Sequence, residues 1–325
     1  MNANRFFCLV VGMILLGFPG GIQAQEKYPS RPIELVVPYA PGGSGDITTR
    51  LFSDKLAKVL KVPVTVVNRA GGAGITGTSY VARAKKDGYT LLGGPATAII
   101  IAPIISKEVT YDPLIDLIPL AHFATSPAVF AVRSDSPFQT LNEMIEYARE
   151  NPGKLKNCVG GIGTECHFSF EILCAKSNVK IGTIPFKGGG EALPALLGGH
   201  VDLSSNSVAT SASYLKAGQI RGLAITSKTR NPDFPNIPTT AELGYSDASF
   251  SVRNGVFAPS GVPRSVLNIL IPTLEKVYKS PEVVQRAAKM SVMVEYMGPD
   301  EFSELIRSEI RIVEKLARDL NLIKK

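Results

Sequence analysis

Hydrophobic and polar residues form two patterns along this chain: short apolar runs, and longer segments with apolar residues three or four positions apart. The run Ile33–Val37 predicts a buried strand, and residues 47–60 predict an amphipathic helix. Further strands are predicted at 62–67 and 89–92, with a helix between them that includes residues 80–84. This βαβαβ order favours a parallel sheet with helices on both faces.

The alternation continues to the end of the chain. Strands are predicted at 117–123, 129–132, 181–185, 201–204, 222–226 and 251–258, with another near Cys158. Helices are predicted at 140–150, 165–176, up to 197 and up to 218, and near 264–279, 281–290 and 299–320. Because no further sheet is predicted after 258, we expect the last three helices to pack back on the first half of the molecule.

These elements indicate an α/β fold of two lobes with mostly parallel sheets. Lobe I is expected to be discontinuous, built from residues 25–124 and 253–325, and lobe II from residues 125–252. The chain then crosses between the lobes twice, near 124 and 252. A cleft between two lobes joined by such a double hinge is a common ligand site.

The N-terminal 24 residues have the features of a signal peptide. Arg5 supplies a positive charge, residues 6–18 form an apolar core, and Ala24 is the small residue expected at the cleavage site. The apolar run is shorter than the roughly 20 residues that a membrane-spanning helix requires. We therefore expect a protein that is exported to the periplasm and cleaved near Ala24.

Charge and cysteine content narrow the function. The net charge is +7, or +6 without Arg5 because residues 1–24 contain no acid, and the basic residues are scattered, so nucleic acid is not an expected partner. Cys158, Cys166 and Cys174 have no zinc-site spacing. Buried free thiols are favoured for them, and a Cys158–Cys166 bridge is the alternative.

Two glycine-rich turns lie between a predicted strand and a predicted helix, at 41–46 and 161–164. The first amides of a helix have no intrahelical partner, and the helix dipole adds positive charge there. Glycine lets a ligand approach that backbone closely. Each turn is therefore a candidate cradle for a carboxylate or phosphate, and Asp46 is the predicted N-cap of the first helix.

Sequence motifs along nearly the whole mature chain resemble the Bug-type solute receptors of tripartite tricarboxylate transporters. The motifs that carry the resemblance lie at 28–33, 36–43 with Asp46, 68–69, 87–91, 111–113, 151–154, 161–164 with His167, 185–188, 196–199 with 201–202, 216–218 and 257–259. The resemblance implies a type II, Venus-flytrap receptor without enzymatic activity or cofactor that closes over a small organic carboxylate or amino acid. It also implies delivery to a membrane permease, and we expect a monomer.

The resemblance places ligand contacts mainly on backbone amides of the two turns. The candidate ligand-binding residues are Tyr39, Pro41, Gly42, Gly43, Ser44, Gly45, Asp46, Gly161, Ile162, Gly163, Thr164, Lys187, Asn206 and Arg253. Asn206 stands where the family often has aspartate, and Arg253 near a usual aromatic residue. These departures favour a more polar or more anionic ligand. The alternatives are a solvated loop charge for Lys187 and a surface or hinge role for Arg253.

Other functions remain as alternatives. The same cleft could serve a sensor that presents its ligand to a membrane kinase. An exported hydrolase would use Ser44, Ser79 or Ser169 with one of the three histidines, but no G-x-S-x-G motif is present. An oxidoreductase is suggested by the GxGxxG pattern at 72–77, which lacks the acid expected about 20 residues later at the end of the next strand. We expect these glycines to form a tight strand–helix junction.

Overall fold

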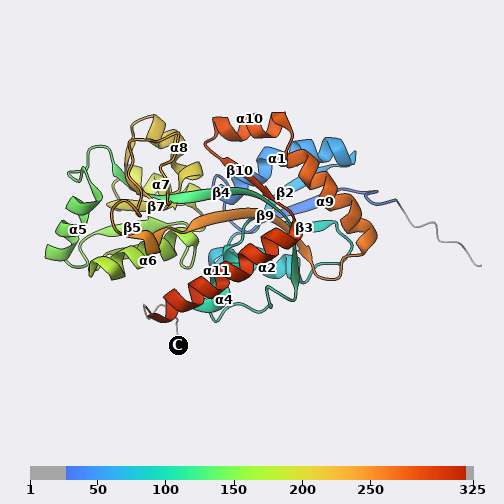
Figure 1. The fold of residues 1–325 in the computed structure, drawn as a ribbon, viewed down its shortest axis with the longest axis horizontal. Coiled ribbons are helices and arrows are strands. Elements are labelled where there is room, and N and C mark those ends of the chain that lie inside the picture. The colour runs from blue at the N-terminus through green and yellow to red at the C-terminus, as the bar shows by residue number, and fades with distance from the viewer. Residues whose placement is uncertain (1–26, 320–325) are drawn as a thin grey trace, which may run out of the picture.

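Two long strands run side by side through the middle of the molecule and connect its two lobes (Figure 1). They are β4 (Leu117–Arg133) and β9 (Ser251–Pro259), and they pair antiparallel. Up to Pro127, β4 pairs with β9 and β10; from Ala128 it pairs with β7 and β8. The computed structural model describes residues 27–319, so the expected signal peptide lies outside the described residues.

Lobe I is the half of the molecule around the chain's first parallel strands, in the order β2-β1-β3-β9. Its strands are β1 (Ile33–Val37), β2 (Val64–Asn68), β3 (Thr90–Pro95) and β10 (Met293–Met297). Its helices are α1 (Ser44–Leu60), η1 (Gly72–Gly74), α2 (Ile75–Ala82), α3 (Thr97–Ile100), α4 (Ala102–Ile105), α9 (Arg264–Tyr278), α10 (Pro281–Lys289) and α11 (Pro299–Asp319).

Lobe II is the half built beyond Ala128, where the strand order is β4-β7-β5-β6. Its strands are β5 (Lys156–Val159), β6 (Gly182–Pro185), β7 (Leu203–Ser207) and β8 (Ile220–Ile225). Its helices are α5 (Leu141–Glu150), α6 (Glu165–Ser177), α7 (Gly189–Leu197), α8 (Val208–Lys216) and η2 (Ser246–Ala248). Because β4 and β9 belong to both halves, the residue limits expected for the lobes stay predictions.

The strands pair in both directions. β1 pairs parallel with β2 and β3, and β5 pairs parallel with β6 and β7. The connecting strands β4 and β9 add antiparallel pairs at the centre. In each parallel set, a helix follows the carboxyl end of a strand. Folds of this kind bind ligands at the edge of the sheet where the carboxyl ends of the strands lie.

The C-terminal helices pack on lobe I, as predicted. α9 and α10 contact α1, and α11 contacts β4, α3 and α4. The rings of Phe52, Phe123 and Tyr278 meet in this core at centroid distances of 4.6 to 5.3 Å. Within residues 27–319, no helix combines the length and apolar character needed to cross a membrane.

Three features of the fold differ from the predicted elements. Residues 117–133 form one strand instead of two, because the polar segment Thr125–Ser126–Pro127 is held in register opposite β9. The strand β10 was not predicted; it exists because it pairs with β4. The short helices α3 and α4 were also missed, since their continuous apolar sequence is mostly buried and has no helical periodicity.

Candidate functional site

A small cavity lies between the lobes, where several helices begin. Lobe I lines it with residues that include Gly43 and Ser44, and lobe II with residues that include Thr164, Glu165 and Gly189. Its volume is about 50 Å³. A cavity of this size holds roughly four water molecules. No lysine or arginine is among the lining residues, so the backbone and short polar side chains determine what binds.

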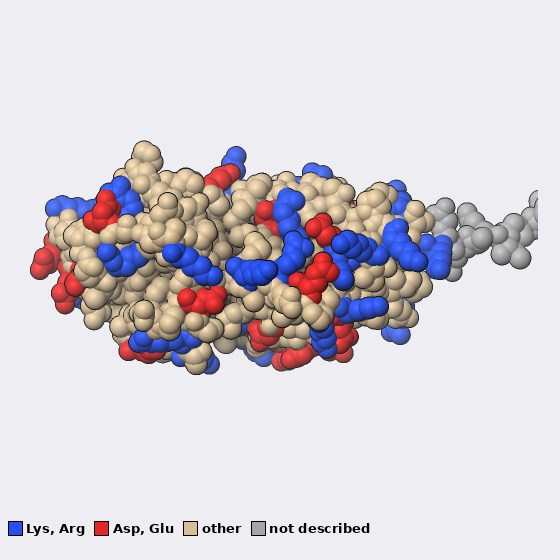
Figure 2. Space-filling model, turned by 90° about the horizontal axis from the view of Figure 1, so that it is seen from above, with Lys and Arg blue, Asp and Glu red and all other residues tan. Residues whose placement is uncertain are grey.

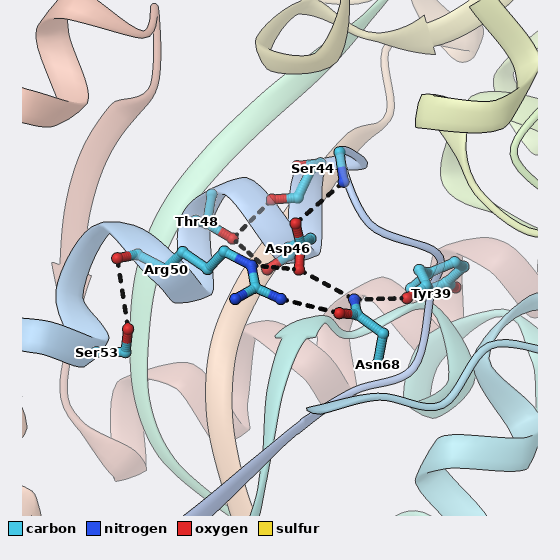
Figure 3. A network of polar contacts seen from close by, with 9 residues as sticks. Tyr39, Ser44, Asp46, Thr48, Arg50, Ser53 and Asn68 are labelled. Atoms are coloured by element: carbon cyan, nitrogen blue, oxygen red, sulfur yellow. Dashed lines mark hydrogen bonds and ion pairs between the residues drawn. The ribbon is translucent and has the colours of Figure 1, made fainter. Parts of the chain in front are cut away.

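The start of α1 is organised around a carboxylate, as Figure 3 shows. The helix begins at Ser44, with Gly43 as its N-cap, so the prediction of Asp46 as N-cap was wrong. Asp46 instead lies in the first turn, where its Oδ2 accepts a hydrogen bond from the Gly42 amide at 3.0 Å. Its Oδ1 accepts from Arg50 Nε at 2.8 Å and from Asn68 Nδ2 at 3.0 Å. Asp46 therefore fixes the turn.

The same bond recurs at α6 and α7. The Gly163 amide donates to His167 Nδ1 at 3.1 Å, and the Lys187 amide donates to Glu191 Oε2 at 3.4 Å. In each case the third residue of the helix binds the amide two positions before the helix starts, a variant of the capping box. His167 thus has a structural role at the start of α6. These bonds hold the turns without occupying the first amides of the helices themselves.

Three helices begin at the cavity. The N-cap residues of α1 and α7 are Gly43 and Gly188, and neither helix start has a side-chain cap. At α6, Thr164 Oγ1 accepts only from the amide of the third helical residue, at 3.2 Å. Unpaired first-turn amides and helix dipoles from three helices therefore converge on one small volume, and this arrangement attracts anions. Ser44 Oγ accepts from Asn254 Nδ2 at 3.2 Å, which leaves its hydroxyl hydrogen free to donate.

One acidic side chain lines this cavity. Glu165 is 3% exposed, and burial raises the pKa of its carboxyl to about 7. Its Oε2 accepts a hydrogen bond from the Thr97 hydroxyl of the opposite lobe. The sequence analysis did not include Glu165 among the candidate ligand contacts.

The lobes contact each other beside the cavity. The Ala40 amide of lobe I donates to the Lys187 carbonyl of lobe II at 3.1 Å. A Cβ atom at Gly190 would lie 2.4 Å from the carbonyl oxygen of Pro41, so only glycine permits this approach. The structure is therefore a closed form, in which the two lobes are in direct contact.

The structure brings six of the predicted site residues to the cavity: Tyr39, Gly43, Ser44, Gly45, Thr164 and Asn206. Gly161 and Ile162 line a wider cavity of about 510 Å³. The predicted residues Pro41, Gly42, Asp46 and Gly163 belong to the supporting turns and do not line the small cavity, and the Lys187 side chain is exposed.

Arg253 also lies outside the cavity lining. Its guanidinium forms an ion pair with Glu309 of α11 at 2.8 Å and donates to Thr125 Oγ1 at 2.9 Å. The hinge role kept as its alternative agrees with this position, since β9 connects the lobes. The neighbouring Val252 lines the cavity instead.

The sequence analysis missed several lining residues: Pro95, Thr97, Gly160, Glu165, Cys166, Gly189, Ser207, Thr210 and Val252. Gly189 begins a helix directly after a strand and loop, so the rule that selected the two glycine turns could have found it. Thr97 follows a strand but has no glycine signal. Its position depends on the packing of α3, which the sequence pattern does not predict.

The histidine, glycine and cysteine residues that suggested catalysis, nucleotide binding or a disulfide have structural roles. The ring of His122 is buried and hydrogen-bonded to the Glu295 carbonyl at 2.7 Å, and burial lowers its pKa to about 4. A Cβ at Gly77 would lie 2.8 Å from Pro38, as expected for a tight strand–helix junction. The three cysteines Cys158, Cys166 and Cys174 are buried and free, so the Cys158–Cys166 bridge is excluded.

Comparison with known proteins identifies the family. Residues 48–322 match the model of the tripartite tricarboxylate transporter family receptor, TctC. BugT of Bordetella pertussis is 31% identical over 314 residues, which are 96% of each chain. A UPF0065 protein in the tcbD-tcbE intergenic region of Pseudomonas sp. (strain P51) is 35% identical over 301 residues, covering 92% of this chain and 89% of that protein.

Solved structures agree with this assignment. The periplasmic binding protein BugD has a TM-score of 0.87 and 30% identity, with 92% of this chain and all of BugD covered. A Rhodopseudomonas palustris protein solved with adipate has a TM-score of 0.86 and 29% identity, covering 90% and 98% of the two chains. MatC from the same organism, with bound malate, has a TM-score of 0.84 and 27% identity, covering 89% and 99%. The chain therefore belongs to the periplasmic solute-binding receptors of the TctC and Bug type.

Proposed function

We propose that this receptor binds the carboxylate of a small organic solute in the cavity where α1, α6 and α7 begin. The observation that carries the proposal is the convergence of three helix N-termini on a cavity without a lining lysine or arginine. Amides and dipoles then supply the positive potential, as in other helix-terminal anion sites. The Ser44 hydroxyl adds a donor.

The solved relatives support a carboxylate as the ligand. Adipate and malate, bound by two structures of this fold, are both organic acids. Figure 2 adds that lysine and arginine are interspersed with acidic residues on the face it shows, without one dominant basic patch. The charge that selects the ligand therefore lies inside the cleft and not on this surface.

Binding is coupled to closure of the lobes. A ligand that contacts α1 of lobe I and α6 or α7 of lobe II makes contacts that the open form cannot make. Such differential contact is what shifts an equilibrium between open and closed forms. Residues 1–24 would direct export, with cleavage near Ala24, and the closed receptor would deliver its ligand to a membrane permease.

Replacement of Gly43 by leucine tests the proposed site. Gly43 has φ −78° and ψ 168°, which any residue adopts, and a Cβ there would meet no atom closer than 3.6 Å. We expect Gly43→Leu to keep the wild-type melting temperature within about 3 °C, because no core contact is lost. The side chain would occupy the cavity and abolish binding, which isothermal titration calorimetry measures with a carboxylate found by a thermal-shift screen.

Gly298→Leu is the matched control. Gly298 also directly precedes a helix, and its Cβ would approach only Tyr296 Oη, at 3.8 Å. This variant should bind like the wild type. Unchanged affinity in Gly43→Leu would show that the ligand binds elsewhere and would overturn the proposed site.

A further inference from the structure

A buried carboxylate faces a cavity that otherwise presents hydrogen-bond donors. Glu165 is the first residue of α6, is 3% exposed and lines the cavity. Its Oε2 is bound by the Thr97 hydroxyl, whereas its Oε1 is buried and has no hydrogen-bond partner among the residues that the structure describes. A buried polar atom without a partner is costly, so a partner from outside the protein is expected.

No basic side chain of the described residues is a hydrogen-bond partner of Glu165 Oε1. Arg253 is a cation whose charge lowers the pKa of Glu165, but its guanidinium is bound by Glu309 and Thr125. The residues that line the cavity include no arginine and no lysine. Buried charges in proteins are normally paired, and no basic residue of the lining pairs with the Glu165 carboxylate.

A second acceptor lies in the same cavity. Asn206 is 2% exposed and donates from Nδ2 to Ser204 Oγ at 2.7 Å. This bond turns the amide oxygen toward the start of α7, where Oδ1 lies 2.6 Å from the position that a Cβ of Gly189 would take. The cavity thus combines amide and hydroxyl donors with two oxygen acceptors, Glu165 Oε1 and Asn206 Oδ1.

We propose that the receptor selects a small amino acid, whose ammonium group donates to Glu165 Oε1 while its carboxylate binds the helix amides. This inference rests on the proposed carboxylate-binding function and names the ligand class of the same site. A zwitterion matches both halves of the lining, because it satisfies the donors and the acidic oxygen together. Glu165 would then be the residue that distinguishes an amino acid from the acid that lacks its amino group.

The protonation state of Glu165 should make the affinity for an amino acid depend on pH. The titratable groups that affect its carboxyl are Tyr39, Cys166, Arg253 and Glu309, together with the Thr97 hydroxyl bond. Burial raises the pKa to about 7, so the empty site is partly protonated at neutral pH. An ammonium group requires the ionised form. Affinity for an amino acid should therefore rise from pH 6 to pH 8, whereas a ligand bound through protonated Glu165 would lose affinity.

The test compares each of the common amino acids with the acid that lacks its amino group, such as alanine with propionate and aspartate with succinate. Titration calorimetry at pH 7.5 should find at least one amino acid that binds tenfold or more tightly than its partner. In Glu165→Gln this preference should fall below threefold, while affinity for the partner acid changes less than threefold.

The variant Thr97→Val tests whether Glu165 selects the ligand or only helps to hold the lobes closed. This variant removes the hydrogen bond between the lobes but keeps the Glu165 carboxylate. Loss of this bond also raises the pKa of Glu165, so the comparison is made at pH 8.5. There the variant should weaken both members of a pair by the same factor and preserve the preference. An equal loss for both members in Glu165→Gln would make Glu165 a closure contact and overturn the inference.

The outcomes also separate this inference from the proposed function. If plain acids bind as tightly as their amino acids, the inference fails and the carboxylate site stands. If no acid or amino acid binds, both fail. Falling affinity for the amino acid between pH 6 and pH 8 would likewise overturn the ammonium contact.

Discussion

At the scale of single residues, the buried Glu165 has a consequence for stability that does not depend on any ligand. Burial raises its folded-state pKa from an ordinary value of 4.5 to about 7. The folded protein therefore holds this proton more tightly than the unfolded chain does. Its contribution to stability is full below pH 4.5 and is lost as the pH rises toward 7.

Comparison of wild type with Glu165→Gln measures this effect. Because the neutral amide does not titrate, the free energy of unfolding of the wild type relative to the variant should fall by about 3 kcal/mol between pH 4.5 and pH 8. Urea unfolding at several pH values, without ligand, gives the difference. Other titrating groups such as His122 are common to both proteins and cancel.

Glu143→Gln is the control for this measurement. Glu143 also lies in the first turn of a helix, α5, but it is exposed, so its replacement lacks the effect of burial and should not reproduce the fall expected for Glu165→Gln. A constant difference between wild type and Glu165→Gln would contradict the raised pKa.

Some of the residues that line the cavity were predicted from the sequence. Gly43, Ser44, Gly45 and Thr164 were found because helix starts after strands have a local signature. Glu165 was missed because an acid in the first turn of a helix is favoured by the helix dipole alone. Its contact across the cavity is with Thr97, which is 68 residues away in the chain.

At the scale of elements, the helix starts that surround the cavity depend on their caps. Thr164 Oγ1 accepts from the His167 amide at 3.2 Å and donates to the Gly161 carbonyl at 3.0 Å. Thr140 caps α5 in the same way, through the Glu143 amide at 3.2 Å, but α5 contributes no residue to the small cavity. The two threonines therefore form a matched pair.

Thr164→Ala and Thr140→Ala should each lower the free energy of unfolding by about 1 kcal/mol, the usual cost of a lost cap. Only Thr164→Ala should also weaken ligand binding, by up to about tenfold if a similar energy is lost from the site. Urea unfolding and titration calorimetry check the two effects. Equal loss of affinity in both variants would show that the cap at α6 has no special connection to the ligand.

The predictable elements are those with a clear period. Amphipathic helices such as α9 and α11, and apolar strands such as β1, were located within a few residues. The strand β10 and the helices α3 and α4 were not, because their structure comes from burial and from pairing with β4. The third helix start, at α7, was located as a helix but not recognised as part of the site.

At the scale of the whole molecule, β4 and β9 are the two segments that connect the lobes, so movement of one lobe relative to the other requires both to bend. The partners of β4 change after Pro127, which pairs with Ser251 at the start of β9. The sequence predicted two crossings between lobes, but it carries no information on how closely the lobes approach. That approach depends on backbone contacts such as the one between Ala40 and Lys187.

Gly190 tests whether this closed form is the ligand-bound form. A Cβ at Gly190 would lie 2.4 Å from the Pro41 carbonyl oxygen and 3.0 Å from Gly42, both in lobe I, so Gly190→Val should block full closure. Small-angle X-ray scattering should find that saturating ligand reduces the radius of gyration of the wild type but not of Gly190→Val. Affinity should fall as well, because the ligand loses its contacts with one lobe.

Gly298→Val, which alters a glycine away from the interface, should compact like the wild type. Compaction of Gly190→Val to the same radius would contradict the role of this contact in closure.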